Sequence, residues 1–289
     1  MTRLPGGLEI RPVTDADLTA VAELLHQRFN RSIAPRDWST LFRGHWDPTP
    51  PHHGMMLVRE RRILGVIGTL HSHREIDGHP WRQCNLHSWF VEDDHRNGSL
   101  PLLMAATADP QVLHFVLTPN DASFKAFRFL KFQPLETRLL VWPNLPWPGG
   151  SRARGVSDPG ADGLPPAAAR IIRDHARAPG LHHVLWQADG TTIHAAWRRT
   201  TWRGWSCAQL LHLEPAPLPP RFLCPLLRRL LGARVAFTLT DGRFLQGFPF
   251  ATRVVERALP TLFRLPRGGP DLPRARIGNL YSELALLHR

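Results

Sequence analysis

The sequence predicts a mixed α/β fold in which one order of strands and helices occurs twice. Strand-like alternation and helix-like spacing of apolar residues follow one another along the chain. A stretch rich in proline and glycine, residues 143–166, interrupts this pattern near the middle. The order of elements before that stretch recurs after it. For 289 residues we therefore predict a domain over 1–142, a linker over 143–166 and a second domain over 167–289.

The first half begins with a short strand and a capped helix. Residues 8–11 form the strand, which ends at Pro12, and Thr14 or Asp15 caps the helix. The apolar positions of that helix recur at helical spacing: Leu18, Val21, Leu24 and Leu25. We interpret the segment that follows, which is rich in Pro, His and Trp and extends to about residue 53, as a loop.

A three-stranded meander then follows in the first half. Residues 54–59 and 62–76 form a hairpin, and Asp77-Gly78 is a strong turn signal. The third strand is predicted over 84–91. The remaining elements are a polar stretch (92–98), a helix (99–107), a strand (112–117), a helix (122–130) and a strand (136–142).

The second half repeats this order without repeating the sequence. The predicted elements are a helix (167–176), three strands (182–187, 191–198 and 207–213), a helix (221–231) and two further strands (234–239 and 252–265). We infer that the second half is a degenerate structural copy of the first.

The composition is that of a folded globular protein. Hydrophobic residues make up 43% of the chain and charged residues 21%, unlike disordered chains. The apolar runs are shorter than a bilayer requires, so we expect no membrane partner. The N-terminal residues turn polar at once and lack a signal-peptide core. Cys84, Cys207 and Cys224 are too few and too scattered for a disulfide framework, which predicts a cytoplasmic protein.

The formal net charge of +12 raises the question of a nucleic-acid partner. Lys125 and Lys131 are the only lysines, so nearly all the positive charge comes from arginine. That bias is typical of a GC-rich genome, and the arginines are spread along the sequence rather than gathered in one run. From the sequence alone we expect no nucleic-acid partner.

The segment that carries chemistry is the end of the third strand and the turn after it. A strand that leads through a polar, glycine-containing turn into a helix leaves unpaired N–H groups at the helix start. Those groups and the helix dipole favour an anion, such as a pyrophosphate. Arg96 lies beside them as a charge partner.

The turn resembles the cofactor motif of the GNAT superfamily of N-acetyltransferases. That family places Arg/Gln-x-x-Gly-x-Gly/Ala after its fourth strand to hold the pyrophosphate of coenzyme A. The sequence of this chain at that position is Val91-Glu92-Asp93-Asp94-His95-Arg96-Asn97-Gly98-Ser99-Leu100, followed by Pro101. Arg96 matches the leading residue, but Ser99 and Pro101 stand at the two glycine positions, and Gly98 lies one place early.

A second match lies on the next helix. The family carries Asn-x-x-Ala/Ser-x-x-x-Tyr-x-x-x-Gly-Phe there. This chain has Asn120, Ser123, Phe127, Lys131 and Phe132 at those positions. Asn120 resembles the residue that reaches the cofactor. Phe127 replaces the tyrosine that often protonates the departing thiolate, and phenylalanine has no proton to give.

The resemblance covers residues 8–142 and implies a fold, a cofactor and an activity. It implies that acetyl-CoA or another acyl-CoA binds and that an acyl group passes to the amine of a small molecule or sugar. The implied cofactor-binding residues are Phe90, Val91, Arg96, Asn97, Gly98, Ser99, Leu100, Asn120 and Phe127. In the second half the corresponding turn, residues 214–220, has four prolines and no glycine, so we expect no nucleotide there.

Acyl transfer to an amine also needs a base. His87 lies in the middle of the third strand and Glu92 at its end, and either is the best base candidate. His71, His73, Cys84 and His87 include zinc-type ligands, but their spacing matches no established zinc pattern, so we predict no metal site.

Two other functions remain open at this stage. The missing tyrosine and the displaced glycines would suit a non-catalytic protein that binds a ligand or partner. The tandem arrangement and the basic charge would suit an aminoacyl-tRNA-dependent transferase, although no lysine-rich helical arm is visible.

Overall fold

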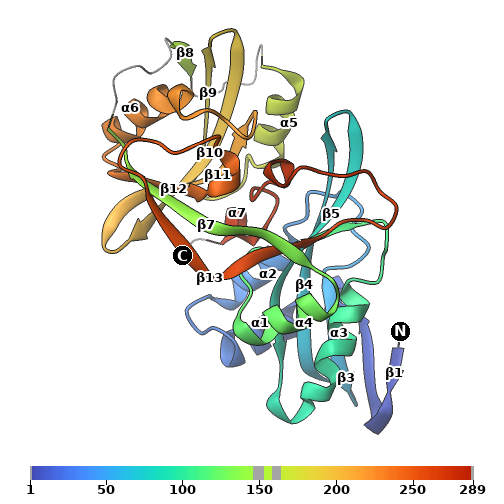
Figure 1. Cartoon of the computed structure of the whole chain (residues 1–289). Helices are drawn as coiled ribbons and strands as arrows, with labels where there is room; N and C mark the ends of the chain where they lie inside the picture. The colour runs from blue at the N-terminus through green and yellow to red at the C-terminus, as the bar shows by residue number, and fades with distance from the viewer. Residues whose placement is uncertain (1, 146–152, 158–163, 288–289) are drawn as a thin grey trace. The chain divides into compact units, whose positions relative to one another are not determined.

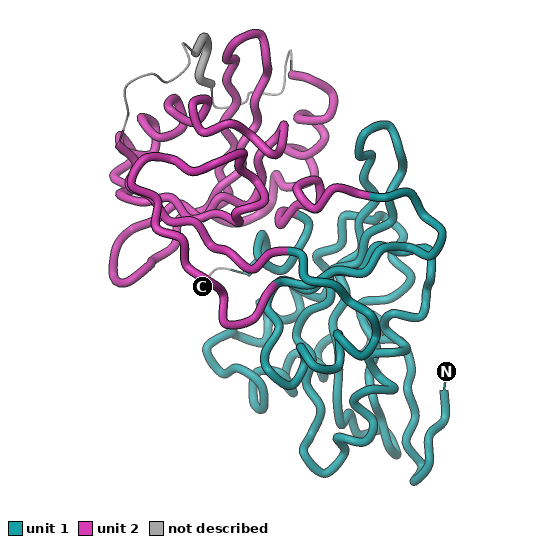
Figure 2. The backbone as a smooth tube through the Cα atoms, in the orientation of Figure 1, with its two compact units in different colours: residues 1–135, 261–271, 281–287 teal, residues 136–260, 272–280, 288–289 magenta. Residues whose placement is uncertain are grey.

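The structure, a computed structural model, describes residues 2–145, 153–157 and 164–287 (Figure 1). The chain forms two compact units (Figure 2). Unit 1 comprises residues 1–135, 261–271 and 281–287, and unit 2 comprises 136–260, 272–280 and 288–289. Within the described residues, no helix is long and apolar enough to cross a membrane.

Unit 1 is built on one mixed sheet with helices on both faces. Its strands in spatial order are β1 (Thr2–Leu4), β2 (Leu8–Pro12), β3 (Gly54–Arg59), β4 (Arg62–Ile76), β5 (His79–Val91), β6 (Leu113–Val116) and the end of β13 (Arg253–Arg264). Neighbouring strands pair antiparallel except β5 and β6, which are parallel. The parallel pair requires a crossover, which residues 92–112 provide.

Two apolar cores form because side chains alternate between the two faces of the sheet. Helices α1 (Leu18–Arg28) and α2 (Pro35–Arg43) pack on one face, against residues such as Met56 and Leu70. Helices α3 (Ser99–Ala106) and α4 (Asp121–Phe129) pack on the other, against residues such as Leu57 and Ile67.

Helix α2 lies inside the segment that we predicted to be a loop, so that prediction is wrong. Pro35 starts the helix without a side-chain cap. Trp38, Leu41 and Phe42 form its buried stripe at helical spacing. Three apolar positions among prolines and histidines gave too short a pattern to identify. Residues 93–98, within the predicted polar stretch 92–98, form a short 3₁₀ helix.

Unit 2 repeats the topology of unit 1. Its elements include β7 (Gln133–Pro143), β8 (Ala153–Ser157), α5 (Pro166–Asp174), β9 (Leu181–Ala188), β10 (Thr191–Trp202), β11 (Trp205–Glu214), α6 (Cys224–Gly232) and β12 (Phe237–Asp241). Strands β9, β10 and β11 form an antiparallel meander, and β12 returns parallel to β11 after α6. The same order connects β3, β4, β5, α3 and β6, so the predicted repeat of elements is present.

The boundaries of the units differ from the predicted domains. Strand β7 pairs with β12, so residues 136–142 belong to unit 2. Residues 261–271 and 281–287 return to unit 1, where β13 pairs with β6. The sequence shows where a strand lies but not which distant strand it joins. Of the predicted linker 143–166, residues 153–157 form strand β8, while 146–152 and 158–163 lie outside the described residues.

A close approach inside unit 1 makes a glycine necessary at position 68. Gly68 pairs with His87 across β4 and β5, and a Cβ atom at Gly68 would run into the His87 ring. We predict that Gly68→Ala lowers the free energy of unfolding by about 1–3 kcal/mol, the usual cost of overpacking a core. Urea unfolding measures this change. Gly232→Ala is the control, because a Cβ atom at Gly232 would have no atom within 4 Å; an equal loss in both variants would contradict the prediction.

Buried histidines make the fold sensitive to acid. Burial lowers the pKa of His87, His114 and His194 to about 3, and that of His45 and His183 to about 4. These values lie below the ordinary pKa of about 6.5, so between those limits the unfolded chain binds protons that the folded chain does not. Stability should therefore fall as the pH falls, by about 1.4 kcal/mol per pH unit for each such histidine.

We predict that unfolding between pH 6.5 and 4.5 takes up more than one proton, measured from the pH dependence of urea unfolding. His87→Leu should reduce that uptake, because it removes one buried titrating group. A stability that does not change over this range, or an unchanged uptake in His87→Leu, would contradict the prediction.

Candidate functional site

The site of unit 1 begins where two parallel strands separate. Strands β5 and β6 pair at only three positions, from Gln83 with Leu113 to Asn85 with Phe115. Strand β6 ends at Val116, whereas β5 continues to Val91 along β4. Within the described residues, the edge of β5 beyond Asn85 therefore pairs with no neighbouring strand on the β6 side.

A buried asparagine occupies the point of separation. Asn85 is completely buried, and its Nδ2 group donates to the carbonyl of Phe115 at 3.4 Å. Its Oδ1 atom accepts from the backbone N–H of Glu283 at 3.1 Å. The Glu283 carboxylate in turn accepts from the Thr118 hydroxyl at 2.9 Å. These contacts fix the end of the β5–β6 ladder and hold the start of α7 (Glu283–Leu286) against it.

A bulge follows in β5. Gly68 pairs with His87 and Val66 pairs with Phe90, so Ser88 and Trp89 together lie opposite the single residue Ile67. Ser88 has a positive φ of 49°. A bulge bends the strand and leaves one backbone group out of the ladder. It thereby changes the direction of Trp89 and of the last residues of β5.

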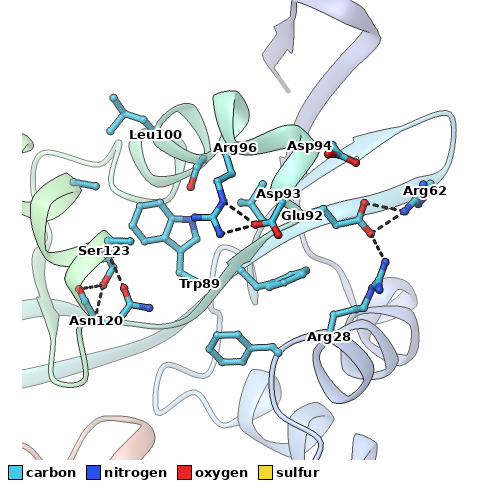
Figure 3. Close-up of a pocket in the computed structure, with 16 residues that line it drawn as sticks. Arg28, Arg62, Trp89, Glu92, Asp93, Asp94, Arg96, Leu100, Asn120 and Ser123 are labelled. Carbon is cyan, nitrogen blue, oxygen red and sulfur yellow. Dashed lines mark hydrogen bonds and ion pairs between the residues drawn. The ribbon is translucent and has the colours of Figure 1, made fainter.

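These features border a cavity of about 730 Å³, which is within the range of small-molecule sites (Figure 3). Strand β5, the 3₁₀ helix, the start of α3 and helix α4 supply most of its wall, and α1 and β4 supply the rest. The lining residues are Arg28, Phe29, Arg62, Trp89, Phe90, Val91, Glu92, Asp93, Asp94, Arg96, Ser99, Leu100, Asn120, Ala122, Ser123 and Ala126.

Helix α3 points its N-terminus at this cavity, since Ser99 and Leu100 line it. Pro101 cannot donate, so fewer N–H groups are available than in most helix starts. Gly98 is buried, and a Cβ atom there would lie 2.6 Å from Leu57 Cδ2. Gly98 therefore lets the helix start pack closely on β3 rather than contacting a ligand.

The charged residues of the cavity form two internal groups. Arg96 donates from Nε and Nη2 to Asp93 Oδ1, at 2.9 and 2.6 Å. Arg62 Nη2 donates to both oxygens of Glu92 at 2.8 Å, and Arg28 lies 3.8 Å from the same carboxylate. Arg62, Arg96 and Asp93 are mostly exposed, whereas the Glu92 side chain is 13% exposed. The three arginines thus face acidic partners before any ligand enters.

Asn120 and Ser123 form the opposite wall of the cavity. The Asn120 side chain accepts from the Ser123 N–H at 2.8 Å, and the Asn120 N–H donates to Ser123 Oγ at 2.9 Å. This capping box starts α4 and fixes the asparagine rotamer. The Nδ2 group of Asn120 takes no part in the cap, so it can donate to a ligand.

Behind this wall, aromatic rings support Trp89. Phe127 is only 2% exposed, with edge-on contacts to Trp89 at 5.7 Å and to Phe132 at 4.9 Å between ring centroids. Phe127 does not line the cavity. A tyrosine hydroxyl at this position would need a buried partner, so phenylalanine suits the surroundings that the structure gives it.

The structure brings together seven of the residues predicted from the sequence. Those lining the cavity are Phe90, Val91, Glu92, Arg96, Ser99, Leu100 and Asn120. Those outside its wall are Asn97, Gly98, Phe127 and His87. Asn97 is exposed on the 3₁₀ helix, and the other three are buried.

His87 is held in the core instead of the cavity wall. Its Nδ1 atom lies 2.9 Å from the Ser88 hydroxyl, and its ring packs edge-on against Phe42 at 5.1 Å. Burial lowers the pKa of His87 to about 3. The position gives His87 no direct approach to a molecule in this cavity, so we do not assign it the role of base there.

Sequence reasoning missed Trp89, Arg28 and Arg62 as wall residues. The bulge reverses the face on which Trp89 would otherwise lie, and the arginines come from distant elements. The Asp93–Arg96 pair was detectable, because residues three apart in a helical turn lie side by side. Within the described part of the chain, no cluster of three His, Cys, Asp or Glu side chains could hold a metal ion.

In unit 2 the corresponding parallel strands, β11 and β12, also separate, but the segments that follow them are joined by hydrogen bonds. Strands β11 and β12 also pair at only three positions, from Cys207 to Gln209. Beyond them, the segments that follow the two strands bond to each other: Leu218 N–H donates to Phe244 O at 2.9 Å, and Gln246 N–H donates to Leu218 O at 3.0 Å. Both Leu218 and Leu245 are buried. In unit 2 the segments that follow the two strands are thus joined to each other by backbone hydrogen bonds.

No family model matches this chain, and no curated protein matches it. Solved structures do. A GCN5-related N-acetyltransferase from Anabaena variabilis is 9% identical, with a TM-score of 0.59 over 89% of this chain and 72% of that one. A GCN5-related N-acetyltransferase from Kribbella flavida is 12% identical, with a TM-score of 0.52 over 90% and 72%.

A predicted acetyltransferase from Pyrococcus horikoshii is similar over nearly its entire length. It is 13% identical and has a TM-score of 0.54, over 96% of this chain and 95% of that one. Identities this low carry information on the fold and none on the substrate. The chain has the fold of the GCN5-related N-acetyltransferases.

Proposed function

We propose that this protein is an acyl-CoA-dependent N-acyltransferase that acts on the amine of a small molecule. The observation that carries the proposal is the open edge of β5 beside a cavity that begins at the N-terminus of α3. A pantetheine arm has amide groups that can pair with such an edge as an added strand would. The pyrophosphate then lies at the helix start, where backbone N–H groups and the dipole favour negative charge.

Arg96 is the proposed charge partner of the pyrophosphate. Its present partner is Asp93, in an ion pair on the surface. Such pairs contribute about 0–1 kcal/mol, so a phosphate group can replace the carboxylate at small cost. Glu92 has its two oxygens engaged by Arg62. We propose that it positions Arg62 and Arg28 at the mouth of the cavity and does not act as the base.

The proposed reaction forms a C–N bond and breaks a C–S bond. The amine attacks the thioester carbon and the electron pair moves to the carbonyl oxygen. As that oxygen reforms the carbonyl, the C–S bond breaks with its electron pair on sulfur, and the amine nitrogen passes its proton to a water molecule. A backbone N–H freed by the Ser88–Trp89 bulge is a suitable donor to the developing oxyanion. The coenzyme A thiolate leaves with a pKa near 8.5, as for a free thiol, so water can protonate it.

The cofactor site gives the first prediction on binding. Arg96→Ala should weaken acetyl-CoA binding about tenfold or more, because a charge-assisted contact contributes about 1.5–3 kcal/mol. Asp93→Asn should strengthen binding severalfold, because it frees Arg96 and removes a carboxylate beside the pyrophosphate. Isothermal titration with acetyl-CoA measures both changes.

Glu23→Gln is the control for charge alone, since Glu23 lies exposed on α1 and outside the cavity wall. It should leave the affinity unchanged. Arg96→Ala with wild-type affinity would remove the pyrophosphate from this position. A gain in Glu23→Gln equal to that in Asp93→Asn would show a long-range charge effect only.

The reaction itself gives a second prediction. No tyrosine is available at position 127 to protonate the thiolate, and loss of a general acid typically costs about 10²–10⁴-fold in rate. We expect slow but measurable thiol release from acetyl-CoA in single-turnover reactions with a panel of amines. Leu100→Trp should abolish release by filling the cavity, whereas Met104→Trp, one turn further on and 51% exposed, should not.

Measurable acetyl-CoA binding without thiol release from any amine would contradict the enzymatic proposal. It would favour the non-catalytic, ligand-binding alternative that the displaced glycines suggest. An increase in melting temperature with acyl-CoA is the simplest preliminary check, because only a ligand of the folded state stabilises it.

A further inference from the structure

The net positive charge of the chain is distributed unevenly between the two units. The residue ranges of unit 1 contain 17 Lys and Arg residues and 16 Asp and Glu residues. The residue ranges of unit 2 contain 19 arginines and 8 acidic residues. Almost the whole excess of the +12 chain therefore belongs to unit 2.

Unit 2 also exposes aromatic rings at one end of its sheet, which we call the aromatic tip: Trp202, Trp205 and Phe237. Trp202 and Trp205 close the β10–β11 hairpin as its last pair, and Phe237 begins β12. Ring centroids lie 6.0 Å apart for Trp205 and Phe237, and 6.5 Å for Trp202 and Phe237. Trp205 is 60% exposed, which is unusual for so large an apolar side chain.

One arginine contacts these rings, while Arg199 lies on the opposite face of β10 from Trp202. The Arg203 guanidinium lies 5.0 Å from the centroid of the Trp202 ring. Arg199 donates to the Ser206 hydroxyl at 2.6 Å and to the Ala233 carbonyl at 2.9 Å, which holds its guanidinium close to the backbone that leads into Arg234. All three arginines are exposed. Among the described residues, none of Arg199, Arg203 and Arg234 has a carboxylate in ion-pair distance.

Several exposed arginines of unit 1, by contrast, lie beside carboxylates. In unit 1, exposed arginines are commonly paired, as in Arg36 with Asp37 and Arg82 with Asp109. In unit 2, Glu136 and Asp241 are buried in a hydrogen-bonded network with Arg243, away from solvent. The aromatic tip thus combines an exposed ring with the Arg203 guanidinium, which has no carboxylate in ion-pair distance among the described residues.

We propose that the aromatic tip of unit 2 binds a nucleic acid with unpaired bases. Exposed aromatic rings stack on bases, and guanidinium groups contact the phosphates between them. Arginine suits both contacts, because its plane stacks and its edge donates to phosphate. A membrane surface is less suited, since two of the three rings are partly buried and only Trp205 projects far enough to insert. A second copy of the chain offers no acidic unit as a partner.

The test measures fluorescence anisotropy of a labelled 12-nucleotide uridine RNA with the full chain at about 50 mM salt. We expect a Kd in or below the range of about 10⁻⁴–10⁻⁶ M that is usual for non-specific binding, and tighter binding of the single strand than of an RNA duplex. Trp205→Ala should weaken binding by about fivefold or more, as loss of one stacked base does. Arg203→Ala should reduce the slope of log Kd against log salt by about 0.7.

Matched variants show whether RNA binding depends on the aromatic tip or on any exposed ring or arginine of the chain. Phe129→Ala removes a ring of unit 1 that is 67% exposed, and Arg31→Ala removes an exposed arginine of unit 1. Both should bind RNA as the wild type does. Saturating acetyl-CoA should not displace the RNA, because the cavity of unit 1 is a different site. Thermal melts establish that each variant is folded.

Three results would overturn the proposal. The first is no RNA binding at low salt. The second is binding that Trp205→Ala and Arg203→Ala leave unchanged. The third is binding of the tip to vesicles of about 30% phosphatidylserine in preference to RNA, when Trp205→Ala abolishes that vesicle binding. None of these outcomes bears on the acyl-CoA proposal, which is tested by titration and thiol release alone.

Discussion

The separation of β5 from β6 beyond Asn85 is the constraint on which the candidate site depends. A parallel pair that continued to Val91 would satisfy the backbone of β5 and leave no cavity. Asn85 stops the pairing by placing a buried amide at the last rung, where it bonds to Phe115 and to the N–H of Glu283. A buried amide without those partners would cost about 1–3 kcal/mol, so the arrangement is strongly fixed.

The two units show two uses of the same separation. In unit 1, within the described residues, no strand pairs with β5 beyond the ladder on the β6 side, and the wall residues of the cavity carry matched positive and negative charge. In unit 2 the chain bonds to itself through Leu218, and prolines replace the donors of the turn. The two units therefore share a topology but differ in the residues and hydrogen bonds that follow the parallel strands. Unit 2 also carries nearly all the excess positive charge, which suggests separate tasks for the two units.

Much of the local structure could be predicted from the sequence. The second strand of the β3–β4 hairpin has alternating apolar residues, and the structure has both strands at the predicted positions. Helix α4 was predicted over 122–130 and spans Asp121–Phe129. Helix α2 and the exchange of β7 and β13 between units did not, because a short helix gives a weak pattern and strand partners are chosen by non-local contacts.

The candidate site could be predicted only in part, for a related reason. Arg96, Ser99 and Asn120 lie in the cavity wall because a motif fixes their spacing along the chain. His87, Gly98 and Phe127 lie in the core, because the side-chain directions of a bulged strand and of packed helices depend on what they pack against. The pairing of Arg96 with Asp93 could be predicted from the spacing, because residues three apart in a helical turn lie side by side.

Hydrogen exchange with and without acetyl-CoA tests the central claim most directly. If the cofactor pairs with the open edge of β5, backbone amides in residues 86–91 and at the start of α3 should exchange more slowly in its presence, while the β10–β11 hairpin of unit 2 should not change. Protection confined to unit 2, or no protection in residues 86–91 at saturating acetyl-CoA, would contradict the account.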